Sequence, residues 1–286
     1  MNASLWRCFV DDLYGFLYRY LTAIIKSIRL FILSGGFWTF PAWIGFWLSR
    51  TEELKVLIQS THFYVRSRRI HLKLTDLYMI TSCVVLEQYN CHENFRISES
   101  DVIIDIGAHI GSFSVYAAQK ALLGHIFSYE PDVASYQQLL KNVQANNLRN
   151  VSVFQEAVGG QAGMRTLYSA ALNSAENNFY WNSSRASVVE CTTLTDIFKK
   201  NKIRRCDFLK IDCEGAEYEI ILNTPADILK QIKRICVECH VGYYFGMRRD
   251  DSTEPPILID FLRRSGFTLK VWRENALHTF IWAIQQ

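Results

Sequence analysis

The sequence has little net charge, and its basic residues are not concentrated in one place. Its 31 Lys and Arg residues nearly balance its 28 Asp and Glu residues, which leaves a formal net charge of +3. The short basic clusters at 66–69, 204–205 and 248–249 lie far apart in the chain. Proteins that bind nucleic acid usually carry a basic patch or stripe. The sequence therefore predicts no nucleic-acid partner, and we interpret these basic clusters as solvent-exposed surface residues.

The sequence also lacks the features of a secreted protein. Its apolar N-terminal stretches have no small-residue cleavage pattern, so we expect no cleavable signal peptide. The eight cysteines lie mostly in apolar segments, which favours reduced thiols in a cytoplasmic protein. Cys236 and Cys239 form a CxxC pair within a strand-like segment, where residues three apart point to opposite faces. Because no second pair exists, we interpret them as core thiols and not as a zinc or redox site.

Residues 1–50 differ in composition from the rest of the chain. They are rich in aromatic residues, and 30–49 carries no charge over a length sufficient to cross a bilayer. Glycine and proline interrupt this run, and its aromatic residues suit the headgroup region. In 13–31, basic residues are spaced among apolar ones, as in a helix that lies on an anionic surface. Three interpretations stay open: membrane-surface association, which we favour, a soluble helical lid, and a true span.

From residue 101 onward, short apolar runs alternate with helical patterns. The predicted strands are 102–106, 126–129, 151–154, 208–211 and 235–237. This alternation is typical of βαβ units and predicts an α/β fold with a mostly parallel sheet covered on both faces. Two further strand-like runs predict a C-terminal antiparallel hairpin. We therefore divide the chain into an N-terminal apolar helical segment (1–55), an extension (56–100) and the main α/β domain (101–286).

A glycine motif follows the first predicted strand. Asp105 and Gly107 lie where this strand ends, and Gly111 opens the next helix. The glycines let the backbone approach a ligand closely, and the helix N-terminus offers free N–H donors. The G-x-x-x-G spacing differs from the dinucleotide-binding G-x-G-x-x-G pattern and lacks the Lys-Ser/Thr of a phosphate loop. A pyrophosphate ligand is therefore disfavoured.

Acidic residues follow three successive predicted strands. Glu130 ends the second strand, where a carboxylate can accept hydrogen bonds from both hydroxyls of a ribose. Glu156 follows the third strand, where an adenine edge would lie. Together with Asp105, these acidic strand tips fit an adenosine that bears an amino acid instead of phosphates.

The chain resembles the FkbM family of S-adenosylmethionine-dependent methyltransferases in five blocks that occur in order: "DVIIDIGAHIGSFSVYAA", "SYEPDVASYQQLLKNVQANN", "EAVGG", "TLTDIF" and "FLKIDCEGAEYEIIL…IKRICVECH". The resemblance covers the chain from about residue 64 onward, and "KIDCEGAE" is its most specific part. It implies a Rossmann-like class I methyltransferase fold, with a seven-stranded sheet that ends in the hairpin. It also implies O-methylation of a hydroxyl on a sugar, glycan, polyketide-like or lipid-linked acceptor.

With this resemblance, S-adenosylmethionine is the expected cofactor. The residues assigned to it are Asp105, Gly107, His109, Gly111, Glu130, Glu156 and Ala157. Asp105 and the glycine turn would hold the methionine moiety, Glu130 the ribose, and the Glu156 region the adenine. His109 is interpreted as a cofactor-loop side chain; many relatives have Asn there, although histidine also occurs.

The catalytic candidates follow the fourth and fifth predicted strands. Methyl transfer from a sulfonium is an in-line displacement, so the acceptor oxygen must be aligned and its proton removed. The candidates are Asp212, Glu214, Glu238 and His240. Asp212 ranks first as base or hydroxyl acceptor, and His240 follows because a neutral imidazole accepts a proton near pH 7. Glu214 and Glu238 would orient these two or hold sugar hydroxyls. Lys210, on a central strand, would either pair with a buried carboxylate, which we favour, or reach the site.

A divalent cation is an alternative use of the same four candidates, because it would acidify the acceptor hydroxyl. Their spacing carries no dedicated metal signature, so we assign no metal ligand. Two further functions stay open, namely N-methylation and a membrane-associated protein that binds S-adenosylmethionine without turnover. The expected partners are a small-molecule, glycan or lipid-linked acceptor and, through 1–50, the inner face of the cell membrane.

Overall fold

The structure is a computed structural model that describes residues 83, 88–168, 179, 186–240, 254–273 and 278–285. The chain divides into two compact units, Met1–Leu86 and Glu87–Gln286, and all of the described residues except Cys83 belong to the second unit. The aromatic segment 1–50, the boundary at 55 and most of the extension 56–100 lie outside the described residues. Among the described helices, none combines the length and apolarity that crossing a bilayer requires.

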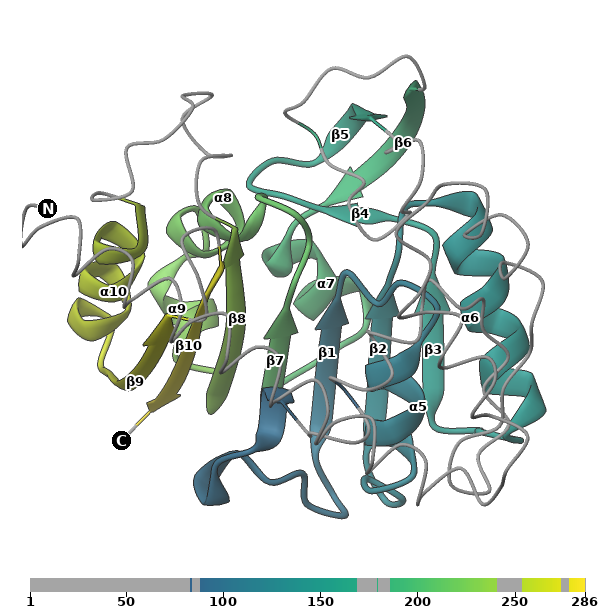
Figure 1. Cartoon of the computed structure of the whole chain (residues 1–286), viewed down its shortest axis with the longest axis horizontal. Helices are drawn as coiled ribbons and strands as arrows, with labels where there is room; N and C mark the ends of the chain where they lie inside the picture. The colour runs from purple at the N-terminus through teal and green to yellow at the C-terminus, as the bar shows by residue number, and fades with distance from the viewer. Residues whose placement is uncertain are drawn as a thin grey trace, which may run out of the picture. The chain divides into compact units, whose positions relative to one another are not determined.

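A seven-stranded sheet forms the centre of this second unit (Figure 1). Its strands are β1 (Val102–Ile106), β2 (His125–Tyr129), β3 (Val151–Phe154), β7 (Phe208–Ile211), β8 (Arg234–His240), β9 (Phe267–Arg273) and β10 (His278–Gln285). They lie in the order β3-β2-β1-β7-β8-β10-β9; the first five are parallel, and β10 runs antiparallel to β8 and β9. The predicted α/β fold, with a mostly parallel sheet and a C-terminal hairpin, is confirmed.

Helices cover both faces of the sheet. The helices after β1 and β2 are α5 (Ser112–Ala118) and α6 (Val133–Ala145). The other face carries α7 (Leu194–Lys200), α8 (Glu217–Leu222), α9 (Ala226–Leu229) and α10 (Glu254–Arg264), whose apolar residues share one core cluster. Capping residues fix where two of these helices begin: the side chain of Asp132 accepts from the Ser135 amide at the start of α6, and Thr193 accepts from Asp196 at the start of α7.

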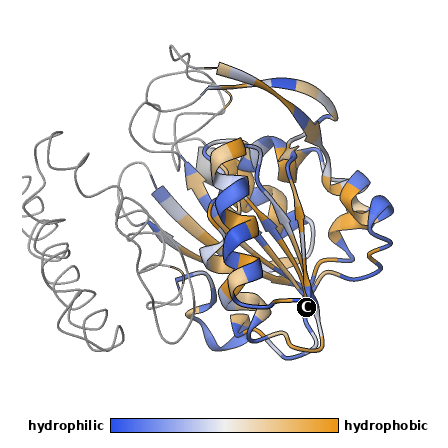
Figure 2. Cartoon of the chain, turned by 90° about the vertical axis from the view of Figure 1, so that its right-hand side faces the viewer, coloured by the Kyte–Doolittle hydropathy of each residue, from blue (hydrophilic) through white to orange (hydrophobic). Residues whose placement is uncertain are grey.

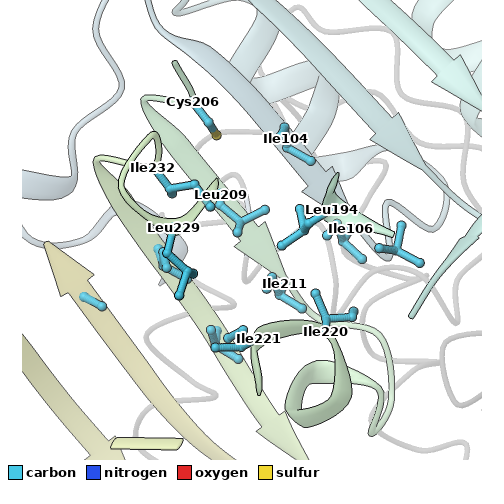
Figure 3. Packing of buried hydrophobic residues seen from close by; sticks show 14 of the residues in the cluster. Ile104, Ile106, Leu194, Cys206, Leu209, Ile211, Ile220, Ile221, Leu229 and Ile232 are labelled. Carbon is cyan, nitrogen blue, oxygen red and sulfur yellow. The ribbon is translucent and has the colours of Figure 1, made fainter. Parts of the chain in front are cut away.

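A large apolar core lies between the sheet and the helices α7 to α10. Side chains alternate along a strand, so Ile104 and Ile106 of β1 point to this face together with Ile211 of β7. Figure 3 shows these isoleucines converging with Leu194 of α7 and with side chains of α8. Figure 2 shows apolar residues concentrated along the central strands. Full burial of each such side chain contributes about 1.5–3 kcal/mol, so this core stabilises the fold substantially.

The opposite face of the same strands carries polar residues among apolar ones. Asp105 of β1 lies opposite Lys210 of β7 in the parallel register, and both side chains are buried. The alternation that turns the isoleucines towards α7 and α8 turns these two residues towards α5. Cys236 and Cys239 of β8 are fully buried, as the sequence predicts for thiols on a strand in the core.

Two features differ from the predicted architecture. A second sheet of order β4-β6-β5, formed by β4 (Ala157–Val158), β5 (Gly163–Tyr168) and β6 (Ala186–Thr192), was not expected; Figure 1 shows it beyond the carboxyl ends of the parallel strands. Most residues of β5 and β6 are at least partly exposed, so these strands lack the buried apolar run that marks the main sheet. The fifth predicted strand, 235–237, extends to His240, which places Glu238 and His240 within the strand itself.

Candidate active site

The turn after β1 is held by a buried polar network. Asp105 is fully buried and accepts a hydrogen bond of 2.5 Å from the Ser114 hydroxyl of α5. Its other oxygen lies 3.2 Å from the Lys210 ammonium group. Lys210 also donates to the Gly107 carbonyl at 2.7 Å, so it ties β7 to the turn after β1. The prediction that Lys210 pairs with a buried carboxylate is confirmed.

The two glycines of the motif are required by close packing. Gly107 has a φ of 73°, and a Cβ built there would lie 1.7 Å from the carbonyl oxygen of Asp212. Gly111 has a φ of 86°, and a Cβ there would lie 2.3 Å from a methyl carbon of Leu139 in α6. Gly107 therefore brings the turns after β1 and β7 into contact, and Gly111 lets α5 begin against α6.

Glu130, at the tip of β2, faces the turn after β1. One carboxylate oxygen accepts a 2.8 Å hydrogen bond from the His109 amide, and the other accepts one of 2.9 Å from the Asp132 amide. Burial raises the pKa of Glu130 to about 7, although these two amides act in the opposite direction. His109 has a φ of 51° and a buried side chain, so its backbone supplies the contact to Glu130.

The tip of β3 is joined to this edge through backbone bonds. The amide of Gly107 donates to the Tyr129 carbonyl of β2, and the amide of Glu130 donates to the Phe154 carbonyl of β3. The side chain of Glu156 is turned towards α7, where it pairs with Lys200 at 2.6 Å. The structure thus brings the tips of β1, β2 and β3 to one edge, with Ala157 buried in β4 and the Glu156 carboxylate engaged by Lys200.

Three side chains meet at the carboxyl ends of β7 and β8. The hydroxyl of Tyr89, from the short 3-10 helix η4 (Gln88–Asn90), donates to Asp212 at 2.6 Å and lies 3.2 Å from Glu238. Burial opposes the ionisation of Asp212, but the charges of Lys210 and His240 and the Tyr89 hydroxyl hold its pKa below the usual value. Asp212 therefore stays ionised at neutral pH, which suits a hydrogen-bond acceptor.

His240 lies among three carboxylates. Its Nδ1 is 2.9 Å from Glu217 Oε1, and its Nε2 is 3.5 Å from Glu214 Oε1 and 3.8 Å from Asp212 Oδ1. Burial alone would lower the pKa of His240, but the charges of Glu214 and Glu217 outweigh it and raise that pKa well above its usual value. From the sequence we expect a neutral imidazole near pH 7, whereas its surroundings in the fold favour the charged form.

In the cluster around His240, the pKa values of the carboxyl groups of Glu214 and Glu238 are raised. Burial raises the pKa of Glu214 to about 8, and the neighbouring carboxylates add to this effect although His240 opposes it. Burial and the charge of Asp212 raise the pKa of Glu238, whose Oε1 lies 3.1 Å from His278 Nδ1. Both groups hold a proton more tightly than Asp212 does, and Glu214 is largely protonated at neutral pH.

The four predicted catalytic residues are therefore brought together, and three further residues join them. These are Tyr89, Glu217 and His278, which were not predicted from the sequence. Glu217 stands in the "KIDCEGAE" block, so the block itself was the signal available. His278 lies opposite His240 in the antiparallel register of β10 and β8, which cannot be derived before the pairing is known.

Two overlapping groups of side chains in the described part of the chain have donor atoms placed as for a metal ion. One consists of Asp212, Glu214 and His240, and the other of Glu238, His240 and His278, with the donor atoms of each group within 4.8 Å of one another.

The carboxylate of Glu130 fits the cofactor that the sequence predicts, because it can still accept hydrogen bonds from a ribose. Each of its oxygens has accepted one amide, and a carboxylate offers about four acceptor positions.

Comparison with known proteins identifies related sequences. A family described as "Methyltransferase FkbM domain" matches residues 105–269, more than half of the chain. Methyltransferase sdnD of Sordaria araneosa is 24% identical over 52% of this chain and 70% of its own length. Methyltransferase 1 of Beauveria bassiana is 22% identical over 52% of this chain and 68% of its own length. The crystal structure of methyltransferase FkbM from Methylobacillus flagellatus covers 86% of this chain and 58% of its own, with 13% identity and a TM-score of 0.46.

Proposed function

The chain belongs to the FkbM family of methyltransferases, and from this premise we propose that it transfers a methyl group from S-adenosylmethionine to a hydroxyl oxygen. The observation that carries the proposal is the cluster of Asp212, Glu214, Glu238 and His240 at the carboxyl ends of β7 and β8. In open α/β sheets, ligands bind beyond these ends, where the strand order reverses. Here the order reverses between β1 and β7.

The tips of β1 and β2 support the assignment of the cofactor. Glu130 presents a buried carboxylate that the amides of His109 and Asp132 hold in place, and its remaining acceptor positions suit the two ribose hydroxyls. Gly107 admits no side chain, so the backbone of the turn can approach a ligand closely. Asp105 would act mainly through Ser114 and Lys210, which it orients. The adenine is assigned to the region of Glu156 and Ala157 beside the tip of β3.

The acidic cluster supplies what the acceptor needs. When bound, S-adenosylmethionine supplies a methyl group whose bond to sulfur breaks, with the electron pair left on sulfur, as the acceptor oxygen bonds to the carbon. Asp212 stays ionised and would orient the hydroxyl as a hydrogen-bond acceptor. The hydroxyl proton would pass to whichever of Glu238 and Glu214 is ionised when the acceptor binds, because the raised pKa gives that carboxylate a high proton affinity. His240, in its charged form, would keep the carboxylates of Asp212, Glu214 and Glu217 in position around it.

The demand for a proton acceptor favours a hydroxyl over an amine. A hydroxyl loses its proton as the new bond forms, so carboxyl groups with raised proton affinity are useful to it. An amine must lose its proton before it attacks, and a field of several carboxylates disfavours that loss. We propose a sugar, glycan, lipid-linked or polyketide-like hydroxyl as the acceptor, from the family resemblance and from the aromatic segment 1–50.

Mass spectrometry of the product tests this proposal. The full-length protein is incubated with a cell extract and S-adenosylmethionine that carries a labelled methyl group, and the labelled product is fragmented. We expect a methyl ether, formed at least ten times more slowly by Asp212→Asn and at an unchanged rate by Asp260→Asn, which alters an exposed carboxylate of α10. A methylated amine in the product would show that the acceptor is an amine and not a hydroxyl. Absence of label from every product would overturn the proposal.

A further inference from the structure

Asp212, Glu214 and His240 place three donor atoms around one point. The Nε2 atom of His240 lies 3.5 Å from Glu214 Oε1 and 3.8 Å from Asp212 Oδ1. Both gaps are too long for a good hydrogen bond. Atoms that bind one metal ion at about 2.1 Å lie about 3.0 to 3.6 Å apart when their bonds meet at about 90° to 120°. The gaps therefore come close to the spacing of ligands around a shared cation.

Glu217 orients the imidazole so that Nε2 points into this space. Its Oε1 accepts the amides of Cys213 at 3.0 Å and Gly215 at 3.1 Å, so it acts as an acceptor towards His240 as well. Nδ1 of His240, 2.9 Å away, is then the donor. Histidines that bind metals usually donate their second ring N–H to a carboxylate or carbonyl, which fixes the ring and its tautomer. Glu217 supplies this contact.

The charges around this point also favour a cation. The buried or nearly buried carboxylates are Asp105, Asp212, Glu214, Glu217 and Glu238. Among the described residues at this edge, Lys210 is the permanently charged cation that faces them, and it contacts Asp105 and Asp212. The Oε2 atom of Glu217 is buried and accepts no hydrogen bond from the described residues. Carboxyl groups that share a buried site tend to hold protons when no counter-ion is present, and a bound cation would take the place of those protons.

A second pair of donors adjoins the first group. Glu238 Oε1 and His278 Nδ1 lie 3.1 Å apart, and with His240 they form a group whose donor atoms lie within 4.8 Å of one another. The rings of His240 and His278 are 5.0 Å apart. His240 thus belongs to both groups and marks the point on which they converge.

We propose that Asp212, Glu214 and Nε2 of His240 bind one divalent cation, which displaces the proton that Nε2 carries in the metal-free protein, with Glu238 and His278 beside it. The inference rests on the proposed function, because this point is where the acceptor hydroxyl is expected to bind. A donor set that mixes imidazole with carboxylates suits a first-row cation such as Mn²⁺ better than Ca²⁺. A hydroxyl bound to the cation releases its proton more readily. Glu238 lies outside the ligand set and receives that proton as the oxygen bonds to the methyl carbon.

Titration of the protein with Mn²⁺ tests the site without requiring turnover. Full-length protein is first treated with a chelator, and free Mn²⁺ is then measured by electron paramagnetic resonance during the titration. We expect one saturable site, whose affinity falls at least ten-fold in Glu214→Gln and in His240→Gln. The matched control is His125→Gln, because His125 of β2 contacts Ser152 and not this cluster. Circular dichroism and thermal unfolding check that each variant is folded; Glu214→Gln keeps the shape of a partly exposed side chain.

The outcomes separate this inference from the proposed function. Absence of saturable Mn²⁺ binding overturns the inference, and so does an affinity in folded Glu214→Gln equal to that of the unaltered protein. S-adenosylmethionine binding is measured separately by calorimetry on the chelator-treated protein. If Mn²⁺ binds at this site but no cofactor binds and no methyl is transferred, the cation site stands and the proposed function falls. If methyl transfer proceeds at full rate with excess chelator and no Mn²⁺ binds, the inference alone falls.

Discussion

The hydroxyl of Tyr89 donates a hydrogen bond of 2.6 Å to Asp212, although 123 residues separate the two in the chain. The same hydroxyl lies 3.2 Å from Glu238, so one phenol stands between the carboxylate that follows β7 and a carboxylate of β8. Tyr89 precedes the residues that the family matches, 105–269. The 3-10 helix before β1 therefore contributes to the proposed site, because its phenol holds Asp212, the carboxylate that we propose as acceptor for the substrate hydroxyl.

Tyr89→Phe tests this contact. The ring keeps its packing against Phe113 and Phe280, so we expect the variant to fold. Loss of the donor leaves Asp212 without that bond, which costs about 1–3 kcal/mol and predicts a fall in kcat of about ten-fold or more. Steady-state methyl transfer is the measurement. Tyr116→Phe is the control, because Tyr116 is an equally buried tyrosine whose hydroxyl accepts from Asn90. Equal kcat values for the two variants would leave Tyr89 with a packing role only.

Glu130→Gln should weaken the binding of S-adenosylmethionine. A neutral amide accepts hydrogen bonds from hydroxyls less strongly than a carboxylate does, and each bond to a charged group contributes about 1.5–3 kcal/mol. We expect the Kd to rise at least ten-fold in isothermal titration. In the unaltered protein, binding should tighten as pH rises through about 7, where Glu130 ionises. Glu190→Gln, at an exposed position of β6, should bind as the unaltered protein does. A Kd for Glu130→Gln that matches this control would contradict the ribose assignment.

The same carboxyl group predicts how stability depends on pH without cofactor. Burial raises the pKa of Glu130 from 4.5 to about 7, so the folded state favours the protonated form. Its contribution is fully present below the unfolded pKa and is lost as pH rises through the folded one. At about 1.4 kcal/mol per pKa unit, the loss is about 3 kcal/mol at most. In thermal unfolding, the difference between Glu130→Gln and the unaltered protein should therefore shift in favour of the variant between about pH 4.5 and about pH 7. A difference that stays constant across this range would exclude the raised pKa.

Gly107→Ala should be far more destabilising than Gly266→Ala. Both glycines have a positive φ, 73° and 92°, so both substitutions carry a similar backbone strain. A Cβ at Gly107 would lie 1.7 Å from the Asp212 carbonyl, whereas a Cβ at Gly266 meets nothing within 4 Å. We expect Gly266→Ala to lower stability by about 1–2 kcal/mol and Gly107→Ala to lower it by several kcal/mol more or to prevent folding. Denaturant unfolding compares them, and similar losses would show that the two turns are not in contact.

Most of the main sheet could be predicted because its strands are short and largely apolar, and because β1 and β7 are buried on both faces. The predicted strands 102–106, 151–154 and 208–211 coincide with β1, β3 and β7, and the C-terminal hairpin is β9 and β10. Such strands are short apolar runs that can be recognised without knowledge of their neighbours. The strands β5 and β6 carry no such signal, because most of their residues are exposed and need not be apolar.

The site could be predicted where it depends on the ends of parallel strands. Asp212 and His240 meet because β7 and β8 are parallel neighbours whose carboxyl ends share one edge. Contacts made by residues outside the parallel strands depend on other elements. The contact of Tyr89 depends on the path of η4, and that of His278 on the register of β10. The raised pKa of His240 depends on Glu214 and on Glu217, whose side chain folds back from α8. These relations are tertiary, and no local pattern in the sequence encodes them.

The initial rate at which labelled methyl passes from S-adenosylmethionine into product tests the central claim most directly. We predict that the unaltered protein transfers methyl and that, at limiting cofactor, the initial rate is at least ten-fold lower in Asp212→Asn and in Glu130→Gln. Asp260→Asn should keep the full rate. Full rates in folded Asp212→Asn and Glu130→Gln would contradict the claim that methyl transfer takes place at the carboxyl ends of β1, β2, β7 and β8.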